Sequence, residues 1–312
     1  MTRYVPEVPS LVRRKAAALG PGGERWLAGL GALVASLEER WSITAVEALD
    51  GGSEAHVVRV RTAEGRDAVL KLAFPGPEGL GEARVLRAAE GRGYARLLAH
   101  DAGRSALLLE PLGPSLAESD LGPERTIEVL CQTLREAWRT PVPAGVPTGP
   151  GTEKAARLGR LVARLWEELG RPCSRRVVDR ALLFAERRAA AFDPARSVLV
   201  HGDPHPGNAL RAPVPRAGAE SGFVFVDPEG FLADPAYDLG VVLRDWCPQL
   251  LAGDAGALAG RYCELLAGGT GVDERAVWEW GFLERVSTGL YTLHHGAKDV
   301  SRPFLETAER LV

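Results

Sequence analysis

The most informative part of the chain is residues 198–208, which read Val198-Leu199-Val200-His201-Gly202-Asp203-Pro204-His205-Pro206-Gly207-Asn208. The three apolar residues at its start are typical of a short buried strand, and the glycines and prolines that follow predict a loop. This loop places one aspartate, two histidines and one asparagine within eight residues. Such side chains on a loop held by a strand indicate a catalytic or binding site, and a polar turn without a chemical role is the simpler alternative.

A second motif supports the chemical interpretation. Residues 223–226 predict another strand, and Asp227 follows it directly, 24 residues after Asp203. Asp203 and Asn208 are five residues apart, which is the spacing of the catalytic aspartate and the metal-binding asparagine in protein kinases. We therefore predict that Asp203 orients an acceptor hydroxyl and accepts its proton. Asn208 and Asp227 are the predicted ligands of Mg²⁺, which prefers oxygen ligands supplemented by phosphates.

Strand patterns fill the first third of the chain, and helical patterns fill the rest. A helix over 10–41 precedes strands at 43–49, 56–61 and 68–72, a helix at 78–90 and a strand at 106–110. Further helices are predicted at 123–138, 153–169, 175–192, 235–247, 255–267 and 273–296. The proline- and glycine-containing stretch 110–114 predicts a hinge. We expect an α+β, two-lobed fold with a nucleotide-binding N-lobe at 1–112. A helical C-lobe at 113–312 would hold the catalytic loop and the acceptor site.

Lysine is rare in this sequence. Arginine occurs 34 times, whereas only four lysines are present: Lys15, Lys71, Lys154 and Lys298. Lys71 ends the third predicted strand, where a lysine can bind the α- and β-phosphates of a nucleotide and pair with a glutamate on the next helix. Glu82 is the predicted catalytic partner, and Glu78 is the alternative one turn earlier. A solvent-facing strand lysine is the simpler interpretation of Lys71.

These motifs, together with residues 234–239, resemble those of the aminoglycoside phosphotransferase family, which has a protein-kinase-like fold. Segments 26–30, 68–72 and 107–110 make the streptomycin 6-kinase and hydroxyurea phosphotransferase group the most similar branch. The resemblance runs from about residue 20 to residue 295. It implies a cytoplasmic kinase that uses ATP or GTP with Mg²⁺.

The resemblance also implies where the nucleotide binds. The turn that contains Gly51, Gly52 and Ser53 would lie over the phosphates, where backbone N–H groups and the Ser53 hydroxyl can reach them. The carbonyl of Glu110 and the N–H of Leu112 would meet the edge of the adenine ring. Both expectations rest on the resemblance alone.

The acceptor is expected in the C-lobe cleft that faces Asp203. Glu229, Asp234 and Asp238 are the candidate acceptor ligands, although in this family the aspartate that corresponds to Asp238 tends to brace the catalytic loop. Carboxylates favour a cationic acceptor because they accept charge-assisted hydrogen bonds from amino or guanidino groups. The resemblance to the streptomycin 6-kinase group implies streptomycin as the acceptor, which fits this preference, and hydroxyurea or another small metabolite is the alternative.

Composition limits the range of partners. The net charge is −3 and the isoelectric point is about 6.1, so the chain has no basic surface typical of nucleic-acid binding. Its longest uncharged apolar stretch, residues 26–37, is too short to cross a bilayer. The four cysteines form no CxxC pair, which predicts reduced thiols. We expect a cytoplasmic protein, and a monomer is favoured.

Two other classes of protein share single features with this sequence. The Gly202–His205 sequence is similar to the G-D-x-H element of two-metal phosphatases, but that chemistry needs further His/Asp clusters. The other histidines are in no such cluster: His56, His100, His294 and His295. An inactive nucleotide-binding pseudokinase would lack at least one catalytic residue, and this chain has Lys71, Asp203, Asn208 and Asp227. No Walker-A sequence is present.

Overall fold

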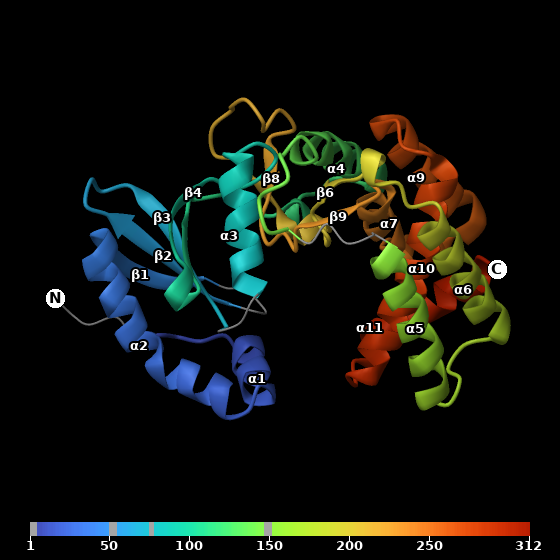
Figure 1. Ribbon diagram of the computed structural model, residues 1–312, viewed down its shortest axis with the longest axis horizontal. Helices are drawn as coiled ribbons and strands as arrows, with labels where there is room; N and C mark the ends of the chain where they lie inside the picture. Colours follow the sequence, from blue (N-terminus) through green and yellow to red (C-terminus); the bar gives the residue numbers. More distant parts are fainter. Residues whose placement is uncertain (1–4, 50–54, 75–77, 147–151) are drawn as a thin grey trace.

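The computed structural model describes four ranges of the 312-residue chain: 5–49, 55–74, 78–146 and 152–312. It has two lobes, one built around an antiparallel sheet and one that is mainly helical (Figure 1). The predicted two-lobed α+β fold is therefore confirmed. Gly51, Gly52 and Ser53, predicted to contact the nucleotide, lie outside the described residues.

The N-terminal lobe contains a five-stranded antiparallel sheet in the order β1-β2-β3-β5-β4. Its elements are α1 (Ser10–Ala18), α2 (Pro21–Trp41), β1 (Ile43–Leu49), β2 (Ala55–Thr62), β3 (Asp67–Ala73), α3 (Glu78–Ala89), β4 (Leu97–Asp101) and β5 (Ala106–Leu109). The helix predicted over 10–41 is interrupted, because Gly20 has a φ of +62° and Pro21 starts a new helix. Strand β4 is absent from the sequence prediction because it contains no β-branched or aromatic residue.

Alternation along the strands gives the sheet two different faces. Leu70 and Leu72 of β3 belong to a core that helix α2 covers, with Leu30 and Leu37 on the helix side. Lys71 lies between the two leucines in the strand, so its side chain points to the opposite face. Helix α3 packs on that face, and Lys71 therefore points toward α3 and the C-terminal lobe.

The C-terminal lobe is built around α10, which contacts α5, α6, α7, α9 and α11. Its helices are α4 (Pro123–Ala137), α5 (Thr152–Glu168), α6 (Arg175–Ala190), α7 (Ala236–Arg244), α8 (Cys247–Ala252), α9 (Ala255–Thr270), α10 (Glu274–His294) and α11 (Lys298–Arg310). Helix α7 ends three residues earlier than predicted, because Asp245 is extended and Trp246 has a φ of +67°. Helix α11 is absent from the sequence prediction, since Pro303 interrupts its helical pattern.

Four short strands carry the catalytic motifs: β6 (Val198–Val200), β7 (Ala209–Arg211), β8 (Phe223–Phe225) and β9 (Phe231–Ala233). Strand β6 pairs with β9, and β7 pairs with β8. Residues 201–208 therefore connect β6 to β7, and Asp227 lies in the connection from β8 to β9. Short 3₁₀ helices occur at Ala102–Arg104, Leu116–Glu118, Pro194–Arg196 and Pro206–Asn208.

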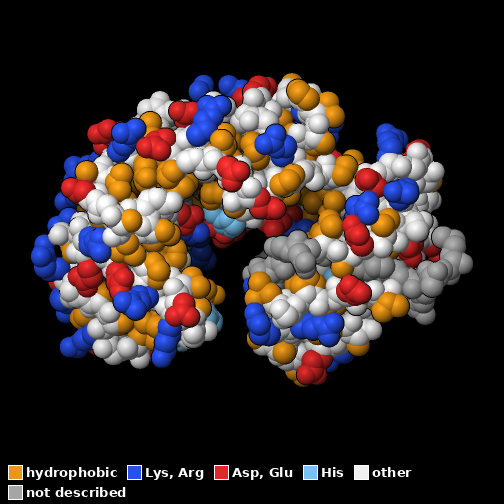
Figure 2. All heavy atoms as spheres, turned by 180° about the vertical axis from the view of Figure 1, so that it is seen from behind, with side chains coloured by type: hydrophobic (Ala, Val, Ile, Leu, Met, Phe, Trp, Pro, Cys, Tyr) orange, Lys and Arg blue, Asp and Glu red, His pale blue; other side chains and the backbone are white. Residues whose placement is uncertain are grey.

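A deep cleft separates the two lobes, with acidic and histidine side chains at its closed end (Figure 2). Backbone hydrogen bonds join strand β8 to the connection between α3 and β4. The Ala95 N–H donates to Phe225 O over 2.9 Å, and the Phe225 N–H donates to Gly93 O over 2.8 Å. These bonds hold strand β8, and with it the segment that leads to Asp227, against the N-terminal lobe. No helix in the described ranges is long and apolar enough to cross a membrane.

Candidate active site

The buried His201 fixes the start of the catalytic loop. Its Nε2 donates to Val226 O over 2.9 Å, so its Nδ1 is free to accept from the Asp203 N–H over 3.1 Å. The ring lies against Tyr94 and Phe225, with ring centroids 5.9 and 4.8 Å away. Burial lowers the pKa of His201 to about 4, although the nearby Asp203 acts in the opposite direction. The imidazole is therefore neutral and positions the backbone of Asp203.

This arrangement predicts a loss of stability in mild acid. The pKa of His201 falls from 6.5 to about 4 on folding, so the unfolded chain takes up its proton first as the pH decreases. The stabilisation is complete above pH 6.5 and is lost as the pH falls toward 4. We expect about 3 kcal/mol from this group. Urea unfolding at several pH values gives the free energy of unfolding as a function of pH. The contribution of His201 is the difference between the slopes of this function in the wild type and in His201→Gln.

The matched control for this prediction is His295→Gln, which changes an exposed histidine. It should retain the pH dependence of the wild type. The comparison with a variant is needed because Asp238 also changes the stability in this pH range. Burial raises the pKa of Asp238 to about 6, so its effect on the free energy of unfolding is opposite in sign to that of His201. An unchanged slope in His201→Gln would show that His201 is not the responsible group.

Asp238 braces the loop and does not face the cleft. One carboxylate oxygen accepts from the His201 N–H and from Trp138 Nε1, each over 2.9 Å, and the other accepts from the Gly202 N–H over 2.9 Å. The side chain is fully buried. This geometry agrees with the role of a brace for the loop, which the resemblance favours, and leaves no carboxylate oxygen open for contact with an acceptor.

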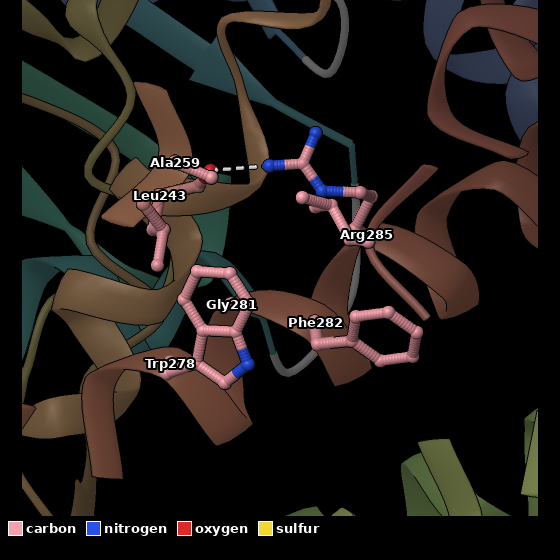
Figure 3. A pocket seen from close by; sticks show the side chains of 7 residues that line it. Leu243, Ala259, Trp278, Gly281, Phe282 and Arg285 are labelled. Carbon is pink, nitrogen blue, oxygen red and sulfur yellow. Dashed lines mark hydrogen bonds between the residues drawn. The ribbon is translucent and has the colours of Figure 1, made fainter. Parts of the chain in front are cut away.

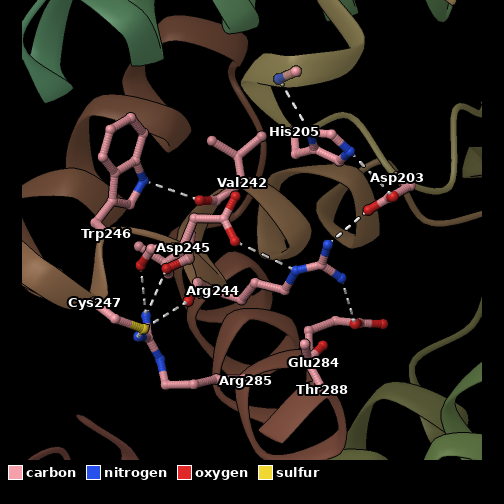
Figure 4. A network of polar contacts seen from close by, with 12 residues as sticks. Asp203, His205, Val242, Arg244, Asp245, Trp246, Cys247, Glu284, Arg285 and Thr288 are labelled. Atoms are coloured by element: carbon pink, nitrogen blue, oxygen red, sulfur yellow. Dashed lines mark hydrogen bonds and ion pairs between the residues drawn. The ribbon is translucent and has the colours of Figure 1, made fainter. Parts of the chain in front are cut away.

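Asp203 projects from the loop and is 37% exposed. Arg244 Nη2 donates to its Oδ1 over 2.6 Å, and His205 Nε2 lies 3.5 Å from its Oδ2 (Figure 4). Partial burial acts to raise the pKa of Asp203, but Arg244 and the two loop histidines outweigh it and lower the pKa. Asp203 is thus a carboxylate at neutral pH, able to accept a hydrogen bond from a hydroxyl group in the cleft.

Arg244 is a site residue that is absent from the sequence prediction. Its Nη1 donates to Glu284 Oε2 over 3.2 Å, and its Nε lies 3.6 Å from Asp245 Oδ1 (Figure 4). The guanidinium therefore links the catalytic loop to helix α10. Arg244 and Asp203 are 41 residues apart, and no local spacing rule connects them.

A second arginine below this network has a structural role. Arg285 is fully buried, and its Nη2 donates to Leu243 O over 2.6 Å (Figure 3). The adjoining cavity, between Leu243, Trp278 and Phe282, measures only about 10 Å³. That space holds about one water molecule, so this cavity is not an acceptor site.

Asn208 and Asp227 lie on neighbouring segments. The Val226 N–H donates to Asn208 O over 2.9 Å, and Asn208 Nδ2 donates to Asp203 O over 3.0 Å. The amide oxygen of Asn208 is therefore turned away from the loop backbone. Asp227 has a φ of +60°, a left-handed conformation that aspartate tolerates better than most residues. Its side chain is 44% exposed, so the carboxylate is open to a ligand.

This donor set fits Mg²⁺. The ion is commonly held by one or two protein oxygens, with phosphate and water oxygens completing the shell. Among the described residues, no group of three or more His, Cys, Asp or Glu side chains forms an all-protein metal site. Asn208 and Asp227 are the residues that would hold Mg²⁺, and the ion would neutralise charge on the nucleotide phosphates.

Lys71 reaches across the cleft to the catalytic segment. Its Nζ donates to Glu82 Oε2 over 2.7 Å and also to Asp227 Oδ1. Burial acts to lower the pKa of Lys71, but the two carboxylates outweigh it and raise the pKa. Burial raises the pKa of Glu82 to about 7, against the effect of Lys71. The side chain of Glu78, the alternative partner, lies outside the described part of the chain.

The hinge is held by a buried ion pair. Arg216 Nη2 donates to Glu110 Oε1 over 2.6 Å, and the same carboxylate accepts from the Arg96 N–H over 2.8 Å. Leu112 is half-buried beside it, and the Gly113 N–H donates to Arg211 O over 2.8 Å. The segment that follows β5 is therefore anchored at Glu110 and Gly113, and its role as a hinge that contacts adenine remains a prediction.

Only some of the acidic residues near the cleft are open to a ligand. Glu229 is 51% exposed. Asp234 is half-buried, and its Oδ1 accepts from the Ala236 N–H over 2.9 Å as a cap of helix α7. Glu279 and Glu284 are buried and paired with arginines. Glu229 is thus the most accessible of the predicted acceptor ligands.

Comparison with known proteins shows the family of the chain. The model of the phosphotransferase enzyme family matches residues 45–278. Streptomycin 6-kinase from Streptomyces glaucescens is 30% identical over 99% of this chain and 98% of its own length. Hydroxyurea phosphotransferase from Kitasatospora aureofaciens is 31% identical over 97% of this chain and 85% of its own length.

Solved structures share the fold at lower identity. A type I macrolide 2′-phosphotransferase covers 89% of this chain and 96% of its own with a TM-score of 0.57 and 17% identity. An aminoglycoside phosphotransferase from Alicyclobacillus acidocaldarius covers 86% of this chain and 90% of its own, with a TM-score of 0.53 and 16% identity. The fold is thus that of a kinase-like phosphotransferase. The chain belongs to the phosphotransferase enzyme family and is an enzyme that transfers phosphate to a hydroxyl group.

Proposed function

We propose that this enzyme transfers the γ-phosphate of ATP or GTP to a hydroxyl group of an aminoglycoside, and that the acceptor is streptomycin. The observation that carries the proposal is a continuous set of contacts at the cleft. Lys71 contacts Asp227, Val226 is hydrogen-bonded to Asn208, and the Asn208 side chain is bonded to Asp203. Phosphate-binding, metal-binding and hydroxyl-activating groups are therefore adjacent.

Lys71 and Asp203 have different roles in phosphoryl transfer. The ammonium of Lys71, held by Glu82, binds the α- and β-phosphates of the nucleotide. Asp203 orients the acceptor hydroxyl in line with the γ-phosphorus and accepts its proton. A bond forms between the acceptor oxygen and phosphorus as the bond to the β–γ bridging oxygen breaks, and the nucleoside diphosphate leaves. Positioning and charge stabilisation supply most of the catalysis in reactions of this class.

Two observations favour a cationic acceptor. The near-full-length similarity to streptomycin 6-kinases extends through the C-terminal lobe, where the acceptor would bind. Glu229 offers an accessible carboxylate, and its N–H donates to His201 O at the start of the catalytic loop over 2.8 Å. A neutral acceptor is the second candidate, because a hydroxyurea phosphotransferase is similar to the same extent.

Product analysis tests the proposal. The purified protein is incubated with ATP, Mg²⁺ and either streptomycin or hydroxyurea, and mass spectrometry follows the acceptor. We expect a singly phosphorylated streptomycin and no product without Mg²⁺. Phosphorylation of hydroxyurea alone would select the second candidate. Reaction of neither compound, together with ready phosphorylation of another alcohol, would overturn the streptomycin assignment.

A further inference from the structure

The side chain of Lys154 occupies a small cage beside the catalytic loop. Its Nζ lies 4.9 Å from the ring centroids of both Phe231 and Tyr237, and 3.4 Å from Glu229 Oε2. The side chain of this lysine is only 11% exposed. It is one of only four lysines in the chain. Two aromatic faces and one carboxylate thus surround a single ammonium group.

The cage is part of the active-site region. The Glu229 N–H donates to His201 O over 2.8 Å, which fixes Glu229 to the start of the catalytic loop. Gly202 has a φ of +97°, and a Cβ atom there would lie 2.7 Å from the Cβ of Glu229. The absence of a side chain at position 202 therefore lets Glu229 pack directly against the residue that precedes Asp203. A cation bound to Glu229 lies next to the loop that carries the catalytic aspartate.

The chemistry of the cage is that of a cation site. Aromatic rings attract ammonium and guanidinium groups through the negative charge on their faces, and the attraction grows when water is excluded. Glu229 adds a charge-assisted hydrogen bond. Glu229 is half exposed whereas Lys154 is nearly covered, so an incoming cation can reach the carboxylate. Lys154 is then a competitor for the same carboxylate.

We propose that Glu229, Phe231 and Tyr237 form a subsite for a cationic group of the acceptor, and that Lys154 is an internal competitor for it. An ammonium or guanidinium group of the acceptor displaces the lysine from Glu229. This inference rests on the proposed function because it requires a cationic acceptor. It adds Lys154 as a residue that sets the affinity for that acceptor. Lys154 weakens the binding of cations, and phosphate contact is not its role.

The kinetic test is Lys154→Met, which keeps most of the side-chain volume and removes the charge. We expect the KM for streptomycin to fall roughly three- to tenfold, with kcat and the KM for ATP within about twofold of the wild type. Lys298→Met, which changes an exposed lysine on α11, is the matched control and should leave all three parameters unchanged. A large decrease in kcat, or a higher KM for streptomycin, would overturn the proposal, because Lys154 would then contact the phosphate or the acceptor.

A binding test separates this inference from the choice of acceptor. Methylguanidinium is titrated into the wild type, Lys154→Met and the double variant Lys154→Met/Glu229→Gln, and saturation-transfer NMR follows the methyl signal. We expect binding to strengthen in the single variant and to be lost in the double variant. This result would support the cage even if streptomycin is not phosphorylated. Equal binding to all three proteins would overturn it. Lys154→Gln replaces Lys154→Met if the latter does not fold.

Discussion

Asp203→Asn is expected to lower kcat by a factor on the order of 10²–10⁴ while folding and nucleotide binding are retained. The asparagine is nearly isosteric, but it cannot accept the proton of the acceptor hydroxyl. Arg244 keeps its contacts with Glu284 and Asp245 in the variant, so the network around the loop is not dismantled. The main change is therefore chemical.

Steady-state kinetics and calorimetric ATP titration measure the two halves of this prediction. Asp193→Asn is a suitable control, because Asp193 is an exposed cap whose side chain accepts from the Ala195 N–H and asparagine caps equally well. That variant should have the turnover of the wild type. Near-normal turnover in Asp203→Asn would mean that another group takes the proton.

Arg244 explains why Asp203 suits this role. The guanidinium holds Oδ1 in a fixed direction and, by lowering the pKa of Asp203, keeps the side chain charged, so Oδ2, which lies 3.5 Å from His205 Nε2, is the oxygen that remains to accept from the hydroxyl. A planar fork of donors can hold Asp203 and Glu284 at the same time, which a lysine ammonium does less well. We regard Arg244 as a positioning residue, because it acts through Asp203.

Features set by local sequence could be predicted. The strand at 68–72 alternates in a way that puts Lys71 on the face opposite its leucine neighbours, and helix α3 follows with Glu82 on the facing side. The five-residue spacing of Asp203 and Asn208 is closed by a hydrogen bond within the same loop. These contacts depend on the periodicity of a strand and on the length of short loops, and both can be read directly from the sequence.

Features set by tertiary packing could not be predicted from local spacing. The contacts of Asp238 with the His201 and Gly202 amides, and that of Arg244 with Asp203, join residues 36 to 41 positions apart. The spacing of Asp238 from Asp234 suits a ligand as well as a brace, so the brace is favoured only through the resemblance to the family. Only the packing of α7 under the loop shows that Asp238 is buried. The cage around Lys154 is likewise formed by α5, β9 and α7 together.

Asp227→Ala should abolish the tightening of ATP binding by Mg²⁺. Asp227 supplies the one carboxylate of the predicted metal site, and Asn208 alone offers a neutral oxygen. A site for this small, strongly hydrated ion needs a charged oxygen to offset the loss of water. Lys71 keeps its hydrogen bond to Glu82 in the variant, so the cation that meets the phosphates remains in place.

Calorimetric titration of ATP with and without Mg²⁺ tests this assignment. In the wild type the dissociation constant should be lower with Mg²⁺, and in Asp227→Ala the ratio of the two constants should be about one. Asp227→Asn should fall between them, because it keeps an oxygen ligand and loses the charge. Burial acts to raise the pKa of Asp227, but Lys71 outweighs it and lowers the pKa, so the carboxylate is charged at neutral pH. If tightening by Mg²⁺ persists unchanged in the alanine variant, the metal is held by other residues and the pairing of Asn208 with Asp227 is refuted.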